Sequence, residues 1–271
     1  GADAQSSVDG ENIITHNIIG ACTFMTIANL VVFIAYDVKQ IKQFNKEKII
    51  IKFKEAKEII KDCMPMAIAG VLNVYVINAV KYAIDSKGDN AMQTYFNIIY
   101  MPTFVINLVS IFIVKPFLKT FGDYWNKDEH KKLFITVLKI ILVLFGVTLI
   151  IEIGCYILGV PVLSMFYGVD ISRYKVELMI LIISGLLYSI CNLLFNMLGT
   201  IRKQTYISIV YIITSIIAVI VSPILVNKYE MMGAVFANLL IMFILCTLLA
   251  ISLIIGIKKQ KSKGEKTEEI L

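Results

Sequence analysis

The amino-acid sequence alternates between long apolar segments and short polar ones. Each apolar segment is about twenty residues long or longer, and a helix of that length crosses the ~30 Å hydrocarbon core of a bilayer. Such segments occur at about 17–36, 64–83, 95–118, 133–160, 176–200, 204–226 and 231–257. The pattern therefore predicts an all-α fold, a polytopic membrane helix bundle of about seven transmembrane helices.

Composition supports a membrane location. Of 271 residues, 58% are hydrophobic and only 17% are charged, and the mean hydropathy is +0.79. A soluble domain is nearer to half apolar and a quarter charged. The five cysteines show no C-x-x-C spacing and there are only two histidines. We therefore expect no disulfide framework, no metal site and no cofactor.

The segment between the first two predicted spans is strongly basic, with eight lysines in residues 37–62. Its apolar positions recur every three or four residues along one face of a helix: Ile49, Phe53, Ala56, Ile60 and Cys63. This spacing is typical of an amphipathic helix that lies on an anionic membrane surface. A soluble linker helix is the alternative interpretation.

Three regions are predicted along the chain. Residues 1–62 would form an outer loop, one transmembrane helix and the basic cytoplasmic amphipathic linker. Residues 63–257 would form a six-helix transmembrane lobe, and residues 258–271 a disordered cytoplasmic tail rich in charged side chains.

Positive charge is unevenly distributed between the two sides that seven alternating spans would create. On one side, which includes residues 37–62 and the C-terminal segment, lie 20 of the 26 lysines and arginines. Because cytoplasmic loops carry an excess of Lys and Arg, we predict a cytoplasmic C-terminus and an outer location for Gly1. An outer start without a signal sequence leads us to expect an odd number of further spans upstream.

The second predicted span ends in a polar face. Asn78, Lys81, Tyr82 and Asp85 have the spacing i, i+3, i+4 and i+7, which places them on one side of a helix. A charge near hydrocarbon costs a few kcal/mol, so Lys81 needs a partner, an aqueous cavity or a ligand. Two interpretations stay open: a ligand-facing role, or a lysine that reaches the outer surface and pairs with Asp85.

Asparagines mark another predicted span. Asn192 and Asn196 are one helical turn apart in the segment 176–200, within a stripe of small and polar residues. Such stripes allow close helix packing and hydrogen bonds across a bundle. A water-filled cavity between helices is the alternative, and then both amides become candidates for binding substrate.

The span 133–160 carries two opposite charges, Lys139 and Glu152. Thirteen residues separate them, so they point about 140° apart and lie ~20 Å apart along the axis. They cannot pair within the helix. Lys139 is expected to extend toward the cytoplasmic surface, whereas Glu152 lies about two turns from the outer end and is a candidate for ion coupling, as is Asp85.

Several function classes lack their signatures. The sequence contains no Walker A pattern, no H-E-x-x-H, no nucleophile elbow and no polar domain large enough for catalysis. The basic residues flank the predicted spans and are not interleaved with aromatic ones as in a nucleic-acid groove. We therefore expect neither an enzyme nor a nucleic-acid partner.

Five segments resemble a known family when taken in order. They are INAVKYAID, YFNIIYMPTFVINLVSIFIVKPFL, GDYWN, LGVPVLSMFYGVDISRYKVELMIL and IRKQ. Together they resemble the C-terminal half of bacterial polysaccharide flippases, the Wzx-type members of the MATE-like multidrug/oligosaccharidyl-lipid/polysaccharide (MOP) exporter superfamily. One position departs from the pattern, since relatives often have proline where this chain has Val80.

The resemblance implies a transporter of two pseudo-symmetric six-helix lobes. Segment 17–36 would be the last helix of the first lobe, and 63–257 would be the second lobe. The implied function is the translocation of undecaprenyl-pyrophosphate-linked oligosaccharide units across the bacterial cytoplasmic membrane for polysaccharide or capsule export. The implied partners are this lipid-linked oligosaccharide, membrane lipids, protons or sodium ions, and the polysaccharide assembly machinery.

Site residues follow from that interpretation. Lys81 would attract the pyrophosphate, and Asn78, Tyr82, Asn192 and Asn196 would hydrogen-bond sugars. Glu152 or Asp85 would couple transport to an ion.

Two alternatives remain open. A multidrug or small-molecule cation antiporter of the same superfamily should favour an acidic, aromatic-lined cavity, against which Lys81 argues. A structural membrane subunit without transport activity should have dry, tightly packed spans.

Overall fold

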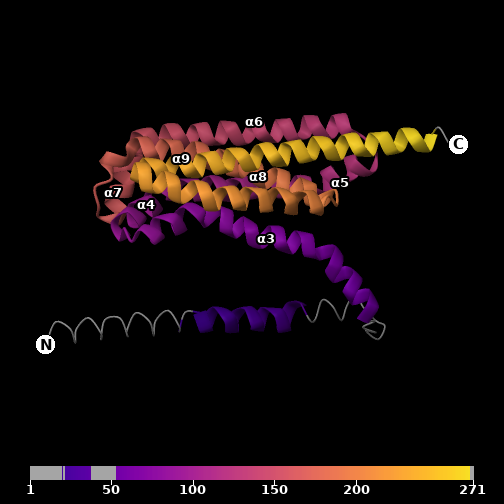
Figure 1. Cartoon of the computed structure of the whole chain (residues 1–271), viewed down its shortest axis with the longest axis horizontal. Coiled ribbons are helices and arrows are strands. Elements are labelled where there is room, and N and C mark those ends of the chain that lie inside the picture. Colours follow the sequence, from indigo (N-terminus) through magenta and orange to yellow (C-terminus); the bar gives the residue numbers. More distant parts are fainter. Residues whose placement is uncertain (1–19, 21, 38–52, 269–271) are drawn as a thin grey trace. The chain divides into compact units, whose positions relative to one another are not determined.

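The structure is a computed structural model that describes residues 20, 22–37 and 53–268, and every regular element in these ranges is a helix (Figure 1). The α-helices from Phe53 onward are α3 (Phe53–Lys87), α4 (Asn90–Val114), α5 (Leu118–Asn126), α6 (His130–Gly154), α7 (Val160–Tyr167), α8 (Lys175–Thr200) and α9 (Gln204–Glu268). Short 3₁₀ or π turns occur at η1 (Phe33–Asp37), η2 (Lys115–Phe117), η3 (Cys155–Gly159) and η4 (Ser172–Tyr174).

Two compact units divide the chain, Gly1–Ile59 and Ile60–Leu271. In the first unit an apolar helical segment, Cys22–Tyr36, lies within the predicted span 17–36. The predicted outer loop and most of the basic linker lie outside the described residues.

Within the described ranges, five helical stretches are long and apolar enough to cross a membrane: Lys57–Lys87, Asn90–Asn126, His130–Tyr167, Ser172–Thr200 and Gln204–Lys258. The prediction of a helical bundle of apolar segments, compatible with a multi-pass membrane protein, is thereby confirmed in its coarse form. The first of these stretches runs through Pro65 without a break, so the end of the predicted linker and the following span form one continuous helix.

The last stretch, Gln204–Lys258, is interrupted where the sequence predicts two separate helices. Its 55 residues would measure ~83 Å as one straight helix, far more than a bilayer core. Glu230 has non-helical backbone angles, φ 51° and ψ −126°. The chain reverses there, and the two halves of α9 run side by side (Figure 1). The second half continues as helix to Glu268, into the segment predicted as a tail.

Local signals explain other chain reversals. The α3–α4 turn contains Gly88 at φ 75°, a left-handed conformation that glycine adopts without strain. Asp89 follows and caps α4, because its carboxylate accepts a 2.8 Å hydrogen bond from the Met92 N–H. Helix α7 ends in the same way, at Gly168 with φ 66°.

Helix α8 is the centre of the second unit. It packs most extensively against α9 and α4, and half of the residues in its most apolar part are buried. In contrast, only 22% of the residues in the most apolar part of α6 are buried, although α6 is the more hydrophobic of the two. The apolar surface of α6 therefore faces outward, as expected for a helix in contact with lipid.

The loops collect at two opposite ends of the second unit. At one end the Lys203 ammonium lies 5.8 Å from the centre of the Trp125 ring. At the other end Lys87 forms a 3.6 Å ion pair with Glu230. The α5–α6 and α8–α9 connections therefore lie at one end of this unit, and the α3–α4 connection and the interruption at Glu230 lie at the other.

Candidate functional site

Lys81 lies against an aromatic ring between two helices. Its ammonium, carried by α3, is 5.0 Å from the centre of the Tyr100 ring on α4, and the side chain is half-buried. The face of an aromatic ring attracts a cation, and the attraction grows as water is removed. Among the described residues no carboxylate lies within 4.0 Å of this ammonium. The alternative pairing with Asp85 is absent, and Asp85 is exposed.

The other predicted members of the Lys81 face are directed elsewhere. The Asn78 amide donates a 2.9 Å hydrogen bond to the Val74 carbonyl of its own helix. Tyr82 stacks on Tyr75 with ring centres 5.8 Å apart. It also lines a cavity of about 160 Å³ between α3 and the first half of α9. Successive helical residues differ by ~100° in direction, so Lys81 and Tyr82 face different neighbouring helices.

Asn192 and Asn196 are brought together, as the sequence predicts. The Asn196 amide donates to the Asn192 side-chain oxygen at 2.9 Å and to its backbone carbonyl at 2.8 Å. The Asn192 amide in turn donates to the Asn107 side-chain oxygen on α4 at 3.3 Å. These half-buried amides link α8 to α4 and form a continuous polar strip.

Further polar side chains extend this strip toward α3 and α9. The Tyr211 hydroxyl donates a 3.1 Å hydrogen bond to the Asn73 side-chain oxygen. Tyr188 of α8 interacts with the same asparagine and lies near Tyr100. We call the whole set the polar seam: Asn73, Lys81, Tyr100, Asn107, Tyr188, Asn192, Asn196 and Tyr211.

Sequence reasoning missed Asn73 as a site residue. Its only signal is a polar side chain in an apolar span, two turns before Lys81. A helical-face argument centred on Lys81 excludes it, because eight residues correspond to about 80° of rotation. Asn73 belongs to the seam because it interacts with Tyr188 of α8 and Tyr211 of α9.

The two predicted ion-coupling residues lie apart from the seam contacts. Glu152 is half-buried on α6 next to Cys155, and within the described ranges it has no ion pair. Asp85 is exposed near the end of α3. The most buried carboxylate of the described residues is instead Glu177, 9% exposed in the first turn of α8. There the free N–H groups of the helix start stabilise negative charge.

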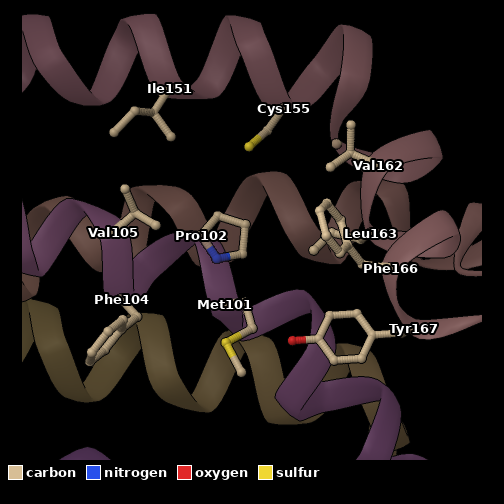
Figure 2. A pocket seen from close by; sticks show the side chains of 11 residues that line it. Met101, Pro102, Phe104, Val105, Ile151, Cys155, Val162, Leu163, Phe166 and Tyr167 are labelled. Atoms are coloured by element: carbon tan, nitrogen blue, oxygen red, sulfur yellow. The ribbon is translucent and has the colours of Figure 1, made fainter.

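An apolar groove adjoins the same helix that contributes Tyr100. It has a volume of about 640 Å³ and lies between α4 and the α6–α7 segment. Figure 2 shows Pro102 near its middle, with Met101 and Tyr167 on one side and Cys155 on the other. Few polar atoms line it, so it suits a hydrocarbon chain. Helix α4 thus presents a polar surface to α3 and α8 and an apolar one to α6.

No family model, no curated protein and no solved structure matches this chain.

Proposed function

We propose that this chain forms part of a flippase that moves undecaprenyl-pyrophosphate-linked oligosaccharide units to the outer leaflet of the bacterial cytoplasmic membrane. The observation that carries the proposal is the Lys81 ammonium, which lies over Tyr100 without a carboxylate partner among the described residues. It belongs to a seam of amides and phenols inside otherwise apolar helices.

The chemistry of the seam matches the head of such a substrate. An ammonium without a carboxylate partner attracts a pyrophosphate, and a hydrogen bond to a charged group contributes about 1.5–3 kcal/mol. Amides such as Asn192 and phenols such as Tyr188 both donate and accept hydrogen bonds, as recognition of sugar hydroxyls requires. The apolar groove on the other side of α4 suits the prenyl tail.

The proposed membrane topology has seven spans. The interruption at Glu230 divides the fifth apolar stretch into two spans, and Cys22–Tyr36 supplies another as the last helix of a first lobe. The lysine-rich loops would face the cytoplasm, as would the C-terminus. Lys81, six residues before the end of α3, would then lie toward the outer surface, where it would act in substrate release.

Glu152 is the proposed ion-coupling residue. A carboxylate in an apolar span, without an ion pair among the described residues, can exchange a proton or hold a cation. Asp85, at the outer end of α3, is the second candidate.

The transport test uses a strain that depends on this protein for surface polysaccharide. We expect Lys81→Ala to lower export at least tenfold, which corresponds to loss of one charge-assisted contact. Lys81→Arg keeps both the charge and the ring contact and should remain within about threefold of wild type. Lys87→Ala is the matched control, because Lys87 lies at the same end and pairs with Glu230. Wild-type export by a well-expressed Lys81→Ala protein would refute the proposal.

A binding test separates the alternatives. Purified protein in lipid nanodiscs is titrated with undecaprenyl pyrophosphate and, separately, with ethidium as an organic cation. Saturable binding of the pyrophosphate, weakened by Lys81→Ala, supports the flippase. Saturable binding of ethidium alone would indicate a cation antiporter, and binding of neither would indicate a structural subunit.

A further inference from the structure

A second groove contains the lysine that the proposed transport mechanism does not use. Lys139 of α6 lines a space of about 410 Å³ between α4, α5 and α6. Phe117, Ile113 and Val143 form apolar parts of its wall, and Tyr124 of α5 contributes a phenol. We call this space the Lys139 groove. Its volume is within the range of ~300–1,000 Å³ that is typical of small-molecule sites.

The charge in this groove is not neutralised by a neighbouring side chain. Lys139 is exposed, and among the described residues no carboxylate lies within ion-pair distance of it. The neighbouring cation Lys132 differs, because it forms a 2.7 Å ion pair with Glu129. The hydroxyl of Tyr124 forms no hydrogen bond in the part of the chain that the structure describes, and it lies near the Lys132 ammonium.

The position of Lys139 along α6 indicates which part of the membrane its ammonium approaches. Lys139 follows His130, the first residue of α6, by nine residues, which corresponds to ~14 Å of helix. A lysine side chain at that depth extends along the helix toward the polar membrane surface, which brings its ammonium closer to the lipid phosphates than its backbone is. The apolar wall around Phe117 and Val143 borders the hydrocarbon side of the same space.

We propose that the Lys139 groove binds one anionic phospholipid, with its phosphate at Lys139 and Tyr124 and an acyl chain along Ile113, Phe117 and Val143. The proposal rests on the membrane placement proposed above, but not on flippase activity. A net negative headgroup such as that of phosphatidylglycerol complements the unpaired ammonium. Phosphatidylcholine has the same phosphate but carries its own cation, so it gains less from Lys139.

The test is native mass spectrometry of the purified protein with phosphatidylglycerol and phosphatidylcholine of identical acyl chains. One lysine near an anionic lipid surface favours binding about fivefold. We therefore expect wild type to retain one phosphatidylglycerol about fivefold better than one phosphatidylcholine. Lys139→Gln should abolish this preference. Lys131→Gln, which removes an exposed lysine of the same helix outside the groove, should leave it unchanged.

A second variant tests the apolar wall. Val143→Trp should reduce the retention of both lipids, because a larger side chain fills the groove without changing its charge. Equal phosphatidylglycerol preference in wild type and Lys139→Gln would overturn the proposal, as would equal losses in Lys139→Gln and Lys131→Gln. Extraction of the wild-type protein from membranes by alkaline carbonate would instead overturn the membrane placement on which both proposals depend. If the wild-type protein shows this lipid preference but has no export activity, only the flippase proposal is contradicted.

Discussion

The sharpest prediction concerns Gly233, which begins the second half of α9. The two halves of this helix approach so closely after the reversal that a methyl group at Gly233 has no room. A Cβ atom built there would lie 2.0 Å from the Leu225 carbonyl oxygen, 2.7 Å from its carbonyl carbon and 3.0 Å from the Tyr229 Cβ. Ordinary contacts of a Cβ atom begin at 3.4 Å. Gly233→Ala therefore requires the backbone to separate by more than about 1 Å.

The energetic cost follows from the identity of the atoms. The Leu225 atoms belong to the backbone, so no side-chain rotation can relieve the overlap. Overpacking of this kind costs about 1–3 kcal/mol and sometimes more, and we place Gly233→Ala at about 3 kcal/mol. The control is Gly146→Ala in α6, where a Cβ meets no atom within 4 Å. There alanine should stabilise the helix by about 0.5–1 kcal/mol, because glycine loses more backbone entropy on folding.

Thermal unfolding in detergent measures the difference. Trp125 is the sole tryptophan and lies 5.4 Å from the His130 ring at the opposite end of the unit, so its fluorescence reports loss of the whole fold. For a domain of this size about 1 kcal/mol corresponds to ~2–4 °C in Tm. We expect Gly233→Ala to melt roughly 10 °C below Gly146→Ala. Melting temperatures within 2 °C of each other would refute the close approach at the reversal.

Two further predictions concern a buried hydrogen bond and an acidic loop. The Asn238 amide donates a 2.7 Å hydrogen bond to the buried Ser184 hydroxyl, so Asn238→Ala should cost about 1 kcal/mol of unfolding free energy. The buried Ser110 hydroxyl has no hydrogen-bond partner among the described residues, so Ser110→Ala should be nearly neutral in the same melting assay. Hydrogen bonds from the Ser172 side chain and backbone lower the pKa of Asp170 below its ordinary value. Their stabilising effect is therefore fully present above pH ~4 and is lost as pH falls through the lowered pKa. The stability difference between wild type and Asp170→Asn should shrink on acidification over that range, and a difference independent of pH would contradict the assignment.

Much of the fold could be predicted from local sequence. Apolar segments of sufficient length located the helices, and the polar positions 227–230 marked the reversal within α9. The asparagine spacing predicted that Asn192 and Asn196 meet, because residues four apart lie on one helical face. These features depend on neighbours in sequence and on the thickness of a bilayer, so the chain itself determines them.

Which neighbouring helix covers each face of a helix was decided only by the tertiary structure. Lys81 and Tyr82 were predicted to act together, yet one meets Tyr100 of α4 and the other lines a cavity beside α9. Helical periodicity gives the direction of a side chain relative to its own helix, but the helix that covers it depends on the packing of the whole bundle. Asn73 was missed for the same reason.

Hydrophobicity is also an incomplete guide in an apolar bundle. Helices α6 and α8 are both strongly apolar, yet only 22% of the most apolar part of α6 is buried, against 50% for α8. Lipid and the protein interior are similarly apolar, so an apolar side chain suits a helix surface that faces either one. The sequence by itself determined which segments are apolar helices, whereas the tertiary structure alone decided which surfaces are core, which are exposed, and which grooves hold a charge.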